Sequence, residues 1–318
     1  MLVLHLKYHM PEKRVLVIYF SQSGQLKRIL DKVTEPLAQA GHRIEWAELQ
    51  PEPAFPFPWT SDQFFDAFPE TFMGIPCKLK PLQTQLAEAY DLVILGYSPW
   101  YLSPSIPMTS FLQTAQAKDL LRNSKVITVI GCRNMWLMSQ EKIKKYLKSL
   151  GADLVGNIVR RDTSSNLVSI VTIIRWLIKG KQEATRWFPR AGVSQQDIDH
   201  SVVFGECIVD SLKRNEFNDL QEHLNAKGAV QIFSSLILFE RNGSKIFKMW
   251  ASKILKKGPY GDPRRKFSHR LFKIYLLAVL FIVSPIGNFV YFFIKLFIKA
   301  KVNRDVQYFS HNSLCDSN

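Results

Sequence analysis

The chain has 318 residues, of which 47% are hydrophobic, and its formal net charge is +15. A sequence this apolar can bury a sizeable core, which excludes a globally disordered chain. The charge favours a nucleic acid, an anionic lipid surface or an acidic partner, and its position along the chain decides between them.

The first structural element predicted from the sequence is a strand. Residues 1–10 lack the apolar run of a signal peptide, so we expect a cytoplasmic N-terminal domain. Residues 14–20 (RVLVIYF) are almost wholly apolar, which is typical of a parallel strand covered on both faces. A polar turn and a helix ending at Gly41 follow, and residues 42–47 alternate as a strand near a sheet edge would.

Residues 51–76 interrupt this pattern, because six prolines alternate there with six phenylalanines. Proline is excluded from strand ladders and helix interiors, so we predict a mostly irregular covering segment. Its aromatic side chains either pack on the sheet or wall a pocket, and packing is the favoured interpretation.

Strands and helices alternate again from residue 82 onward. The apolar periodicity predicts strands over 91–95, 125–130 and 154–159, and helices over 82–89, 110–121, 140–150 and 197–212. This alternation predicts a doubly wound parallel sheet, which we place in a domain over residues 13–215.

An insertion, residues 163–192, separates the last strand from the last helix. Residues 167–178 are almost wholly apolar, with a narrow polar stripe and a basic end. The stripe consists of Ser169, Thr172, Arg175 and Lys179. The pattern favours a helix at a membrane interface over a buried core helix.

The C-terminal region, residues 216–318, has a different character. Residues 246–257 place apolar side chains on one side and lysines largely on the other, the pattern of a basic membrane-surface helix. Residues 274–294 carry no charge and are long enough to span a bilayer, but the sequence SPIGN at 284–288 indicates a turn.

Basic residues flank both ends of this apolar stretch: Arg264, Arg265, Lys266, Arg270 and Lys273 before it, and Lys295, Lys299, Lys301 and Arg304 after it. Both ends therefore favour the cytoplasm. A hairpin inserted in one leaflet at the cytoplasmic face of the inner membrane satisfies this better than a single kinked span. Because the excess charge lies beside apolar stretches and no nucleic-acid module contains it, anionic lipid headgroups are the predicted partner.

Ligands of an open parallel sheet bind at the carboxyl ends of its strands, where the winding reverses. For strand order 2-1-3-4-5, three loops meet at this point. The first is Ser21-Gln22-Ser23-Gly24-Gln25-Leu26, in which two hydroxyls, a glycine and the amides of a helix N-terminus suit a phosphate. A plain strand-to-helix turn is the alternative.

The other two loops suit a planar ring. Ser98, Pro99, Trp100 and Tyr101 offer flat faces, or else only cover the sheet edge. In the third loop, Arg133 or Asn134 could bond ring carbonyls or a substrate oxygen, after Gly131 and Cys132. Cys132 is either redox-active or a small buried residue, and the second is favoured.

Ser21, Ser23 and Gly24 resemble the phosphate signature of flavodoxins, although Leu26 stands where that family usually has Thr or Ser. The resemblance covers residues 13–215 and is shared with flavodoxin-like NAD(P)H:quinone reductases. It implies an α/β flavodoxin-like fold with a five-stranded parallel sheet of order 2-1-3-4-5, FMN as the cofactor in these three loops, and a possible homodimer. The membrane-associating helical extension follows this domain.

The opening VLVIYFSQSGQL, the Pro/Phe-rich segment and the hydrophobic tail are together similar to bacterial dialkylresorcinol condensing enzymes. That resemblance implies a role in making aryl lipids with a partner ketosynthase. An FMN protein would aromatise a hydrophobic cyclic dione, with a hydride passing to the flavin while a base removes the neighbouring proton.

Tyr101 and His200 are candidates for that base by position only. The four cysteines have neither the spacing nor the histidines of a metal site, so no metal is expected. Two alternatives remain: an NAD(P)H:quinone reductase, and an FMN-free scaffold or electron carrier for a membrane-bound partner enzyme.

Overall fold

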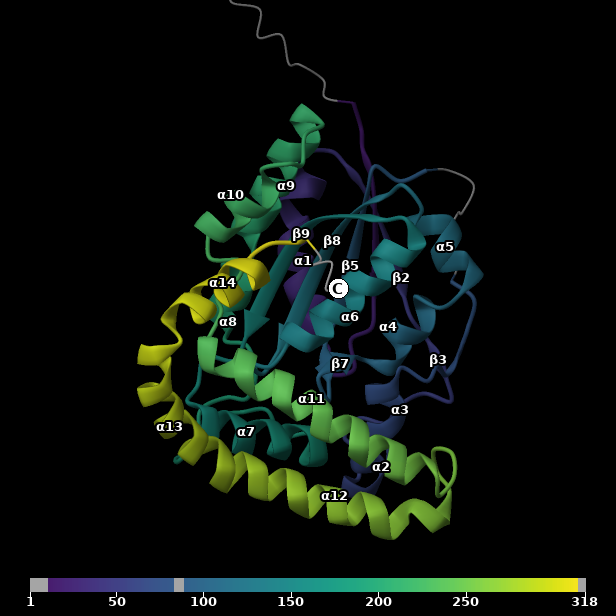
Figure 1. Cartoon of the computed structure of the whole chain (residues 1–318). Coiled ribbons are helices and arrows are strands. Elements are labelled where there is room, and N and C mark those ends of the chain that lie inside the picture. The colour runs from purple at the N-terminus through teal and green to yellow at the C-terminus, as the bar shows by residue number, and fades with distance from the viewer. Residues whose placement is uncertain (1–10, 83–88, 314–318) are drawn as a thin grey trace, which may run out of the picture.

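A computed structural model describes residues 11–82 and 89–313 and contains a central sheet of five parallel strands (Figure 1). The strand order is β2-β1-β5-β8-β9, which confirms the predicted flavodoxin-like, doubly wound topology. The strands are β1 (Arg14–Tyr19), β2 (Arg43–Glu48), β5 (Leu92–Tyr97), β8 (Lys125–Cys132) and β9 (Asp153–Arg161).

Helices cover both faces of the sheet and build two apolar cores. One face carries α1 (Gln25–Gln39), α8 (Gln195–Asp199), α9 (Val202–Arg214) and α10 (Leu220–Ala226). The other carries α4 (Ile106–Phe111), α5 (Ala115–Leu121) and α6 (Leu137–Leu150).

Two single helices predicted from periodicity are each two helices. The prediction over 110–121 is replaced by α4 and α5, which separate because Thr114 caps the N-terminus of α5. The prediction over 197–212 is replaced by α8 and α9, with Ser194 capping α8. The helix predicted over 82–89 falls almost entirely outside the described residues.

The Pro/Phe-rich segment is more regular than predicted. It contains α2 (Ser61–Asp66) and α3 (Phe68–Met73), and the short strand β3 (Pro51–Glu52) pairs with β4 (Lys78–Leu79). Thr60 and Gln63 form a reciprocal capping box at the start of α2. Pro69 lies in the first turn of α3, where a missing amide hydrogen costs little. The prediction of an irregular segment was therefore wrong for residues 61–73.

The helix predicted to lie on the membrane through residues 246–257 belongs to α11 (Ser234–Leu255). Its apolar side faces the protein. Phe247 and Ile254 are buried, and the Phe247 ring lies 5.2 Å from the Phe68 ring and 5.6 Å from the Phe272 ring, centroid to centroid. The apolar face of this segment is thus covered by α3 and α12, which corrects its assignment as a lipid-binding face.

After α11 the chain forms one long C-terminal helix, residues 263–297, along one side of the molecule (Figure 1). It consists of the 3-10 turn Pro263–Arg265, α12 (Lys266–Ala278), a π-helical turn Val279–Val283 and α13 (Ser284–Phe297). The turn predicted at 284–288, and with it the hairpin, is absent: the π turn carries the helix through, and Pro285 occupies the first turn of α13. The stretch Pro263–Lys295 is long and apolar enough to cross a membrane, and its most apolar 18 residues have a mean hydropathy of 2.2.

A buried ion pair fastens the start of this long C-terminal helix to the Pro/Phe-rich segment. The Arg265 side chain is fully buried, and its two terminal nitrogens donate to the carboxylate of Glu70 at 2.6 and 2.9 Å. Its Nε lies 2.8 Å from Asp66 Oδ1, which is also 3.2 Å from His269 Nδ1. The bidentate geometry compensates for the loss of hydration of these charges.

Replacing Arg265 should therefore destabilise the fold. Arg265→Met leaves two buried carboxylates without their cation, and we expect the free energy of unfolding to fall by about 3–5 kcal/mol. Urea unfolding of the detergent-purified protein measures this. Arg264→Met is the matched control, because Arg264 is exposed and pairs with Asp262 at the surface. Equal losses in the two variants would contradict the assigned role of Arg265.

Candidate functional site

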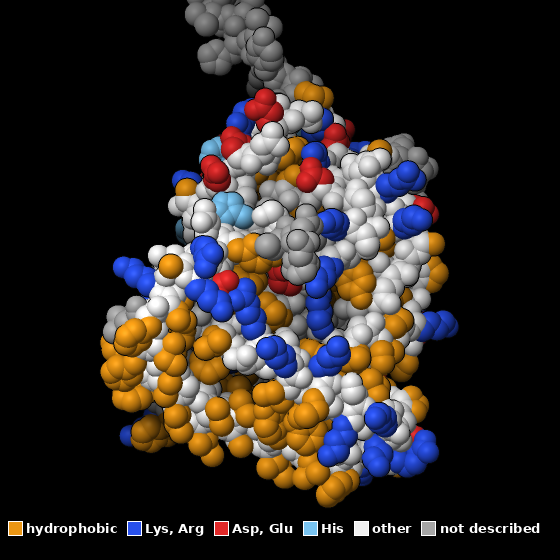
Figure 2. Space-filling view, viewed as in Figure 1, with side chains coloured by type: hydrophobic (Ala, Val, Ile, Leu, Met, Phe, Trp, Pro, Cys, Tyr) orange, Lys and Arg blue, Asp and Glu red, His pale blue; other side chains and the backbone are white. Residues whose placement is uncertain are grey.

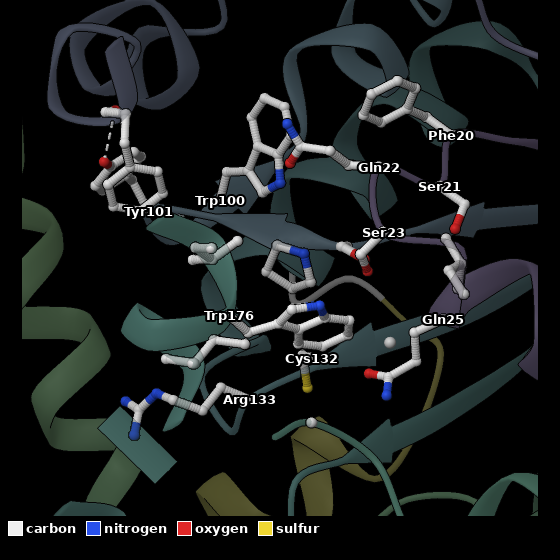
Figure 3. A pocket seen from close by; sticks show the side chains of 18 residues that line it. Phe20, Ser21, Gln22, Ser23, Gln25, Trp100, Tyr101, Cys132, Arg133 and Trp176 are labelled. Carbon is white, nitrogen blue, oxygen red and sulfur yellow. Dashed lines mark hydrogen bonds between the residues drawn. The ribbon is translucent and has the colours of Figure 1, made fainter. Parts of the chain in front are cut away.

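The carboxyl ends of β1, β5 and β8 meet at a cavity of about 180 Å³ (Figure 3). All three predicted loops line it, through Ser21–Ser23 with Gln25 and Leu26, then Ser98–Tyr101, then Gly131–Arg133. Of the predicted cofactor-binding residues, Gly24 lies at the start of α1 without lining the cavity, and Asn134 lines a neighbouring one. The sheet topology therefore does bring these loops together.

The N-terminus of α1 provides a cradle for an anion. Gly24 precedes the helix in the left-handed region, with φ of 76°, and neither a side-chain cap nor an acidic residue lies in the first turn. The Ser21 hydroxyl accepts a hydrogen bond from the Lys27 amide at 3.3 Å. Burial and the neighbouring charge of Arg190 lower the pKa of Arg28. A bound phosphate fits the amides of the first turn of α1, because a helix N-terminus attracts an anion.

Three residues of the first loop have other roles than the predicted contact with phosphate. Gln25 exchanges two hydrogen bonds with the backbone of Val193, at 3.3 and 3.2 Å, and Gln22 donates to Pro56 O at 2.8 Å. Leu26 is buried in the core against Gly131. The hydroxyl that flavodoxins have at this position is therefore replaced by core packing.

The insertion covers the cavity, which sequence reasoning did not predict. Its helix α7 (Asn166–Lys179) lines the cavity with Ile173, Trp176 and Leu177, and Gly192 lines it further along the chain. In Figure 3, the indole rings of Trp176 and Trp100 lie on opposite sides of the cavity. Of the predicted polar stripe on α7, Ser169 and Thr172 are buried, whereas Arg175 is half-buried and Lys179 is exposed. The two tryptophans were visible in the sequence, but their meeting depends on the tertiary fold.

Arg133 sits at the boundary between this cavity and a second one. Its Nη1 donates to Asn166 Oδ1 at 2.8 Å and to Ser169 Oγ at 3.2 Å, so α7 fixes its position. Asn134 donates to the same Asn166 oxygen at 3.1 Å. Burial lowers the pKa of Arg133 to about 10, which leaves the guanidinium charged at neutral pH.

The second cavity is larger, about 370 Å³, and mostly apolar. Seven residues line both cavities: Phe64, Pro99, Tyr101, Cys132, Arg133, Ile173 and Leu177. The remaining walls of the second cavity come largely from α2, α7, α11 and α12, including Phe65, Ile170, Ile174, Phe247, Leu276 and Leu277. The site therefore has a polar end at α1 and an apolar end between α7 and the long C-terminal helix.

The two candidate bases do not suit the role. The Tyr101 hydroxyl donates to Phe64 O at 2.8 Å, and burial raises its pKa well above the usual value. His200 is exposed at the end of α8 with its ring against Phe204, and it lines neither cavity. The base therefore stays unassigned.

The other residues that could take part in redox, acid–base or metal chemistry are Cys132 and the acidic and histidine side chains near the two cavities. Burial raises the pKa of the Cys132 thiol, which keeps the thiol protonated. Of the two interpretations of Cys132, this favours a small packing residue over a redox-active thiol. Among the described residues, neither cavity is lined by Asp, Glu or His. Residues 11–82 and 89–313 also contain no cluster of three His, Cys, Asp or Glu side chains that could hold a metal.

Comparison with solved structures gives flavodoxin-like proteins. A flavoprotein in complex with FMN from Lactobacillus acidophilus is 17% identical, with a TM-score of 0.34, over 46% of this chain and 93% of that one. A putative flavoprotein from Bacteroides eggerthii is 16% identical, with a TM-score of 0.38, over 51% and 98%. Oxidised flavodoxin 1 from Bacillus cereus is 14% identical, with a TM-score of 0.34, over 62% and 97%. No family model and no curated protein matches the sequence.

Gly192 is expected to be required at the edge of the cavity. Its φ is 86°, and a Cβ there would lie 2.7–2.8 Å from the Gln25 amide and the Trp176 ring. Gly192→Ala should lose stability through both strain and this clash, and it should change tryptophan emission. Gly228→Ala is the matched control, because its φ is 83° and nothing lies within 4 Å, which leaves only a strain of about 1–2 kcal/mol. Equal losses of unfolding free energy would contradict the contact.

Glu240 of α11 supports the third loop from behind. Its buried carboxylate accepts hydrogen bonds from the amides of Trp136, Leu137 and Met138, at 3.0, 3.3 and 2.8 Å. Burial raises the pKa of Glu240 to about 7, from 4.5 for the free residue. An acid with a raised pKa in the folded chain stabilises the fold below its unfolded pKa, and this contribution is lost as pH rises through 7.

The unfolding free energy should therefore fall between pH 5 and pH 8 by up to about 3 kcal/mol more in the wild type than in Glu240→Gln, which cannot ionise. Urea unfolding at the two pH values measures the difference. Glu222→Gln, at an exposed position, serves as the control and should follow the wild type. Parallel pH profiles for the wild type and Glu240→Gln would exclude this role for Glu240.

Proposed function

We propose that this chain is a membrane-associated, FMN-dependent oxidoreductase that acts on a hydrophobic cyclic substrate. The observation that carries the proposal is the junction of a phosphate-sized cradle at α1 with an apolar cavity across Arg133. FMN would place its phosphate at the amides of the first turn of α1, beside Ser21 and Ser23. The side chains of Trp100 and Trp176 offer flat faces for its ring.

The residues around the apolar cavity support a carbonyl substrate. Bound FMN supplies a hydride acceptor. The fixed, charged guanidinium of Arg133 would stabilise negative charge that develops on a substrate oxygen, among side chains that are mostly apolar. A dione carries carbon-bound protons that its own carbonyls make acidic. Because the described lining lacks Asp, Glu and His, the proton released as the hydride leaves would pass to solvent water.

Within this class, we assign the substrate to aryl-lipid biosynthesis. The resemblance to dialkylresorcinol condensing enzymes implies a cyclic dione made by a partner ketosynthase, which FMN would oxidise to an aromatic ring. The apolar cavity supports a substrate with alkyl chains, because leucine, isoleucine and phenylalanine make up most of its walls, beside a few polar residues such as Ser61, Arg133 and Lys273. The chain would act at the cytoplasmic face of the membrane, and a homodimer belongs to the same proposal.

The same apolar cavity also suits a quinone. Oxidation of NAD(P)H by a soluble quinone, with no turnover of a cyclic dione, would favour an NAD(P)H:quinone reductase instead. A protein that holds FMN but turns over neither substrate would favour an electron carrier.

FMN binding itself tests the phosphate cradle. Charge-assisted contacts to the phosphate should make FMN bind at least about tenfold more tightly than riboflavin, which lacks this group. Ser23→Glu adds a negative charge at the cradle and should remove that preference. Quenching of flavin fluorescence by the detergent-purified protein measures both affinities.

Ser149→Glu, at an exposed position near the end of α6, is the matched control and should bind as the wild type does. A colourless protein that takes up neither flavin would overturn the proposed function.

A further inference from the structure

The long C-terminal helix, residues 263–297, presents many of its large apolar side chains outward. Phe267, Phe289 and Phe297 are exposed to 72%, 68% and 88%. Near its start, Arg265, Ser268 and His269 are buried against the domain, whereas the charged side chains of Arg264, Lys266 and Arg270 are exposed. This arrangement is the reverse of a helix on the surface of a soluble protein.

These exposed side chains form one continuous face. In Figure 2 hydrophobic side chains gather along the lower and left edges of the molecule, where Figure 1 places α12 and α13. Leu167 of α7 and Trp187, which follows it in the insertion, are also exposed. Lysines and arginines lie beside this apolar face in the same view, as expected where a protein meets anionic headgroups.

Both ends of the long C-terminal helix are held by the same domain. At its start, Arg265 pairs with Glu70 and Asp66. After its end, α14 (Lys299–Phe309) returns to the domain: Asp305 forms a bidentate ion pair with Arg241 of α11, at 2.8 and 2.9 Å. The Tyr308 hydroxyl donates to Glu141 of α6 at 2.7 Å, and Phe309 is buried in one of the two sheet cores.

The middle of the helix also contacts the domain. Asn166 of α7 donates to Ser284 Oγ at 3.4 Å. A Cβ at Gly287 would lie 2.8 Å from the ring of Phe239, so α13 approaches α11 closely at this glycine. A spanning helix must place its two ends on opposite sides of a hydrocarbon layer about 30 Å thick. A helix that rests on one domain at its start, middle and end does not meet this condition.

We infer that the long C-terminal helix lies in a single leaflet, along the membrane surface, and that with α7 it forms the lipid-binding face of the protein. The partner is a bilayer with anionic headgroups, which the basic residues on both flanks of the helix contact. The apolar cavity then lies directly behind this face, since Leu276, Leu277 and Leu280 line it from the inner side. The inference is independent of FMN and of the proposed reaction.

Accessibility of the two flanks tests this topology. Lys266→Cys and Lys301→Cys place thiols at exposed positions before and after the apolar stretch of the full chain. We expect a membrane-impermeant maleimide to label both in inverted vesicles and neither in intact spheroplasts, after subtraction of the wild-type signal from the native cysteines. Labelling of either one from the outer side would overturn the inference. So would labelling of neither in inverted vesicles until detergent is added.

Vesicle binding tests the face itself. Phe289→Glu combined with Phe292→Glu changes two exposed side chains, so the fold should persist, as near-UV circular dichroism would show. In a sedimentation assay we expect at least about tenfold lower affinity for mixed phosphatidylcholine and phosphatidylglycerol vesicles. Burying one phenylalanine side chain in the apolar layer contributes more binding free energy than a tenfold change in affinity requires. Gln39→Glu combined with Gln196→Glu adds the same charge at exposed sites on the sheet-covering helices and should bind normally. Unchanged binding of the phenylalanine variant would overturn the inference.

Discussion

The buried pairing of Arg265 with Glu70 and Asp66 connects parts of the chain that lie nearly two hundred residues apart. It fixes α12 against α2 and α3, and stacking of Phe272 on Phe68, with ring centroids 3.7 Å apart, continues the same contact. The apolar cavity exists because these elements meet α7 and α11 around it. The ion pair of Arg265 thereby positions the walls of the apolar cavity. The sheet domain and the C-terminal helical region therefore pack against each other around this cavity.

Much of the fold could be predicted from sequence, because β1, β5 and β8 are apolar runs, and β2 shows the alternation of a strand near a sheet edge. The regular parts of residues 61–73 could not, since their helices depend on a capping box and on a proline in a first turn. The continuous helix through Pro285 was missed for a related reason. A π-helical turn directly before Pro285 accommodates the missing amide hydrogen of this proline. The preferences of single residues do not predict a π-helical turn.

The three loops of the candidate site could be predicted, because sheet topology places them together. The cover over the site could not be predicted, because it depends on packing between distant segments. Strand order alone brings Ser21, Trp100 and Arg133 together. The cover formed by Trp176 and Gly192 depends on the hydrogen bonds between Gln25 and Val193, a contact across 168 residues that no local pattern indicates. The position of Leu26 has a physical reason as well, because it packs against Gly131 where a polar side chain would be buried.

The boundary at Arg133 separates two kinds of residue along one continuous site. Side chains on the α1 side contact the end that suits a cofactor, and α11 and α12 contact the end that suits an apolar chain, whereas α7 lines both ends. On the proposed function, substitutions at Ile174 or Leu277 alter which chain lengths fit and leave the redox potential of the cofactor unchanged. Substrate range can then diverge among related proteins, or be engineered, without any change in the machinery that transfers electrons.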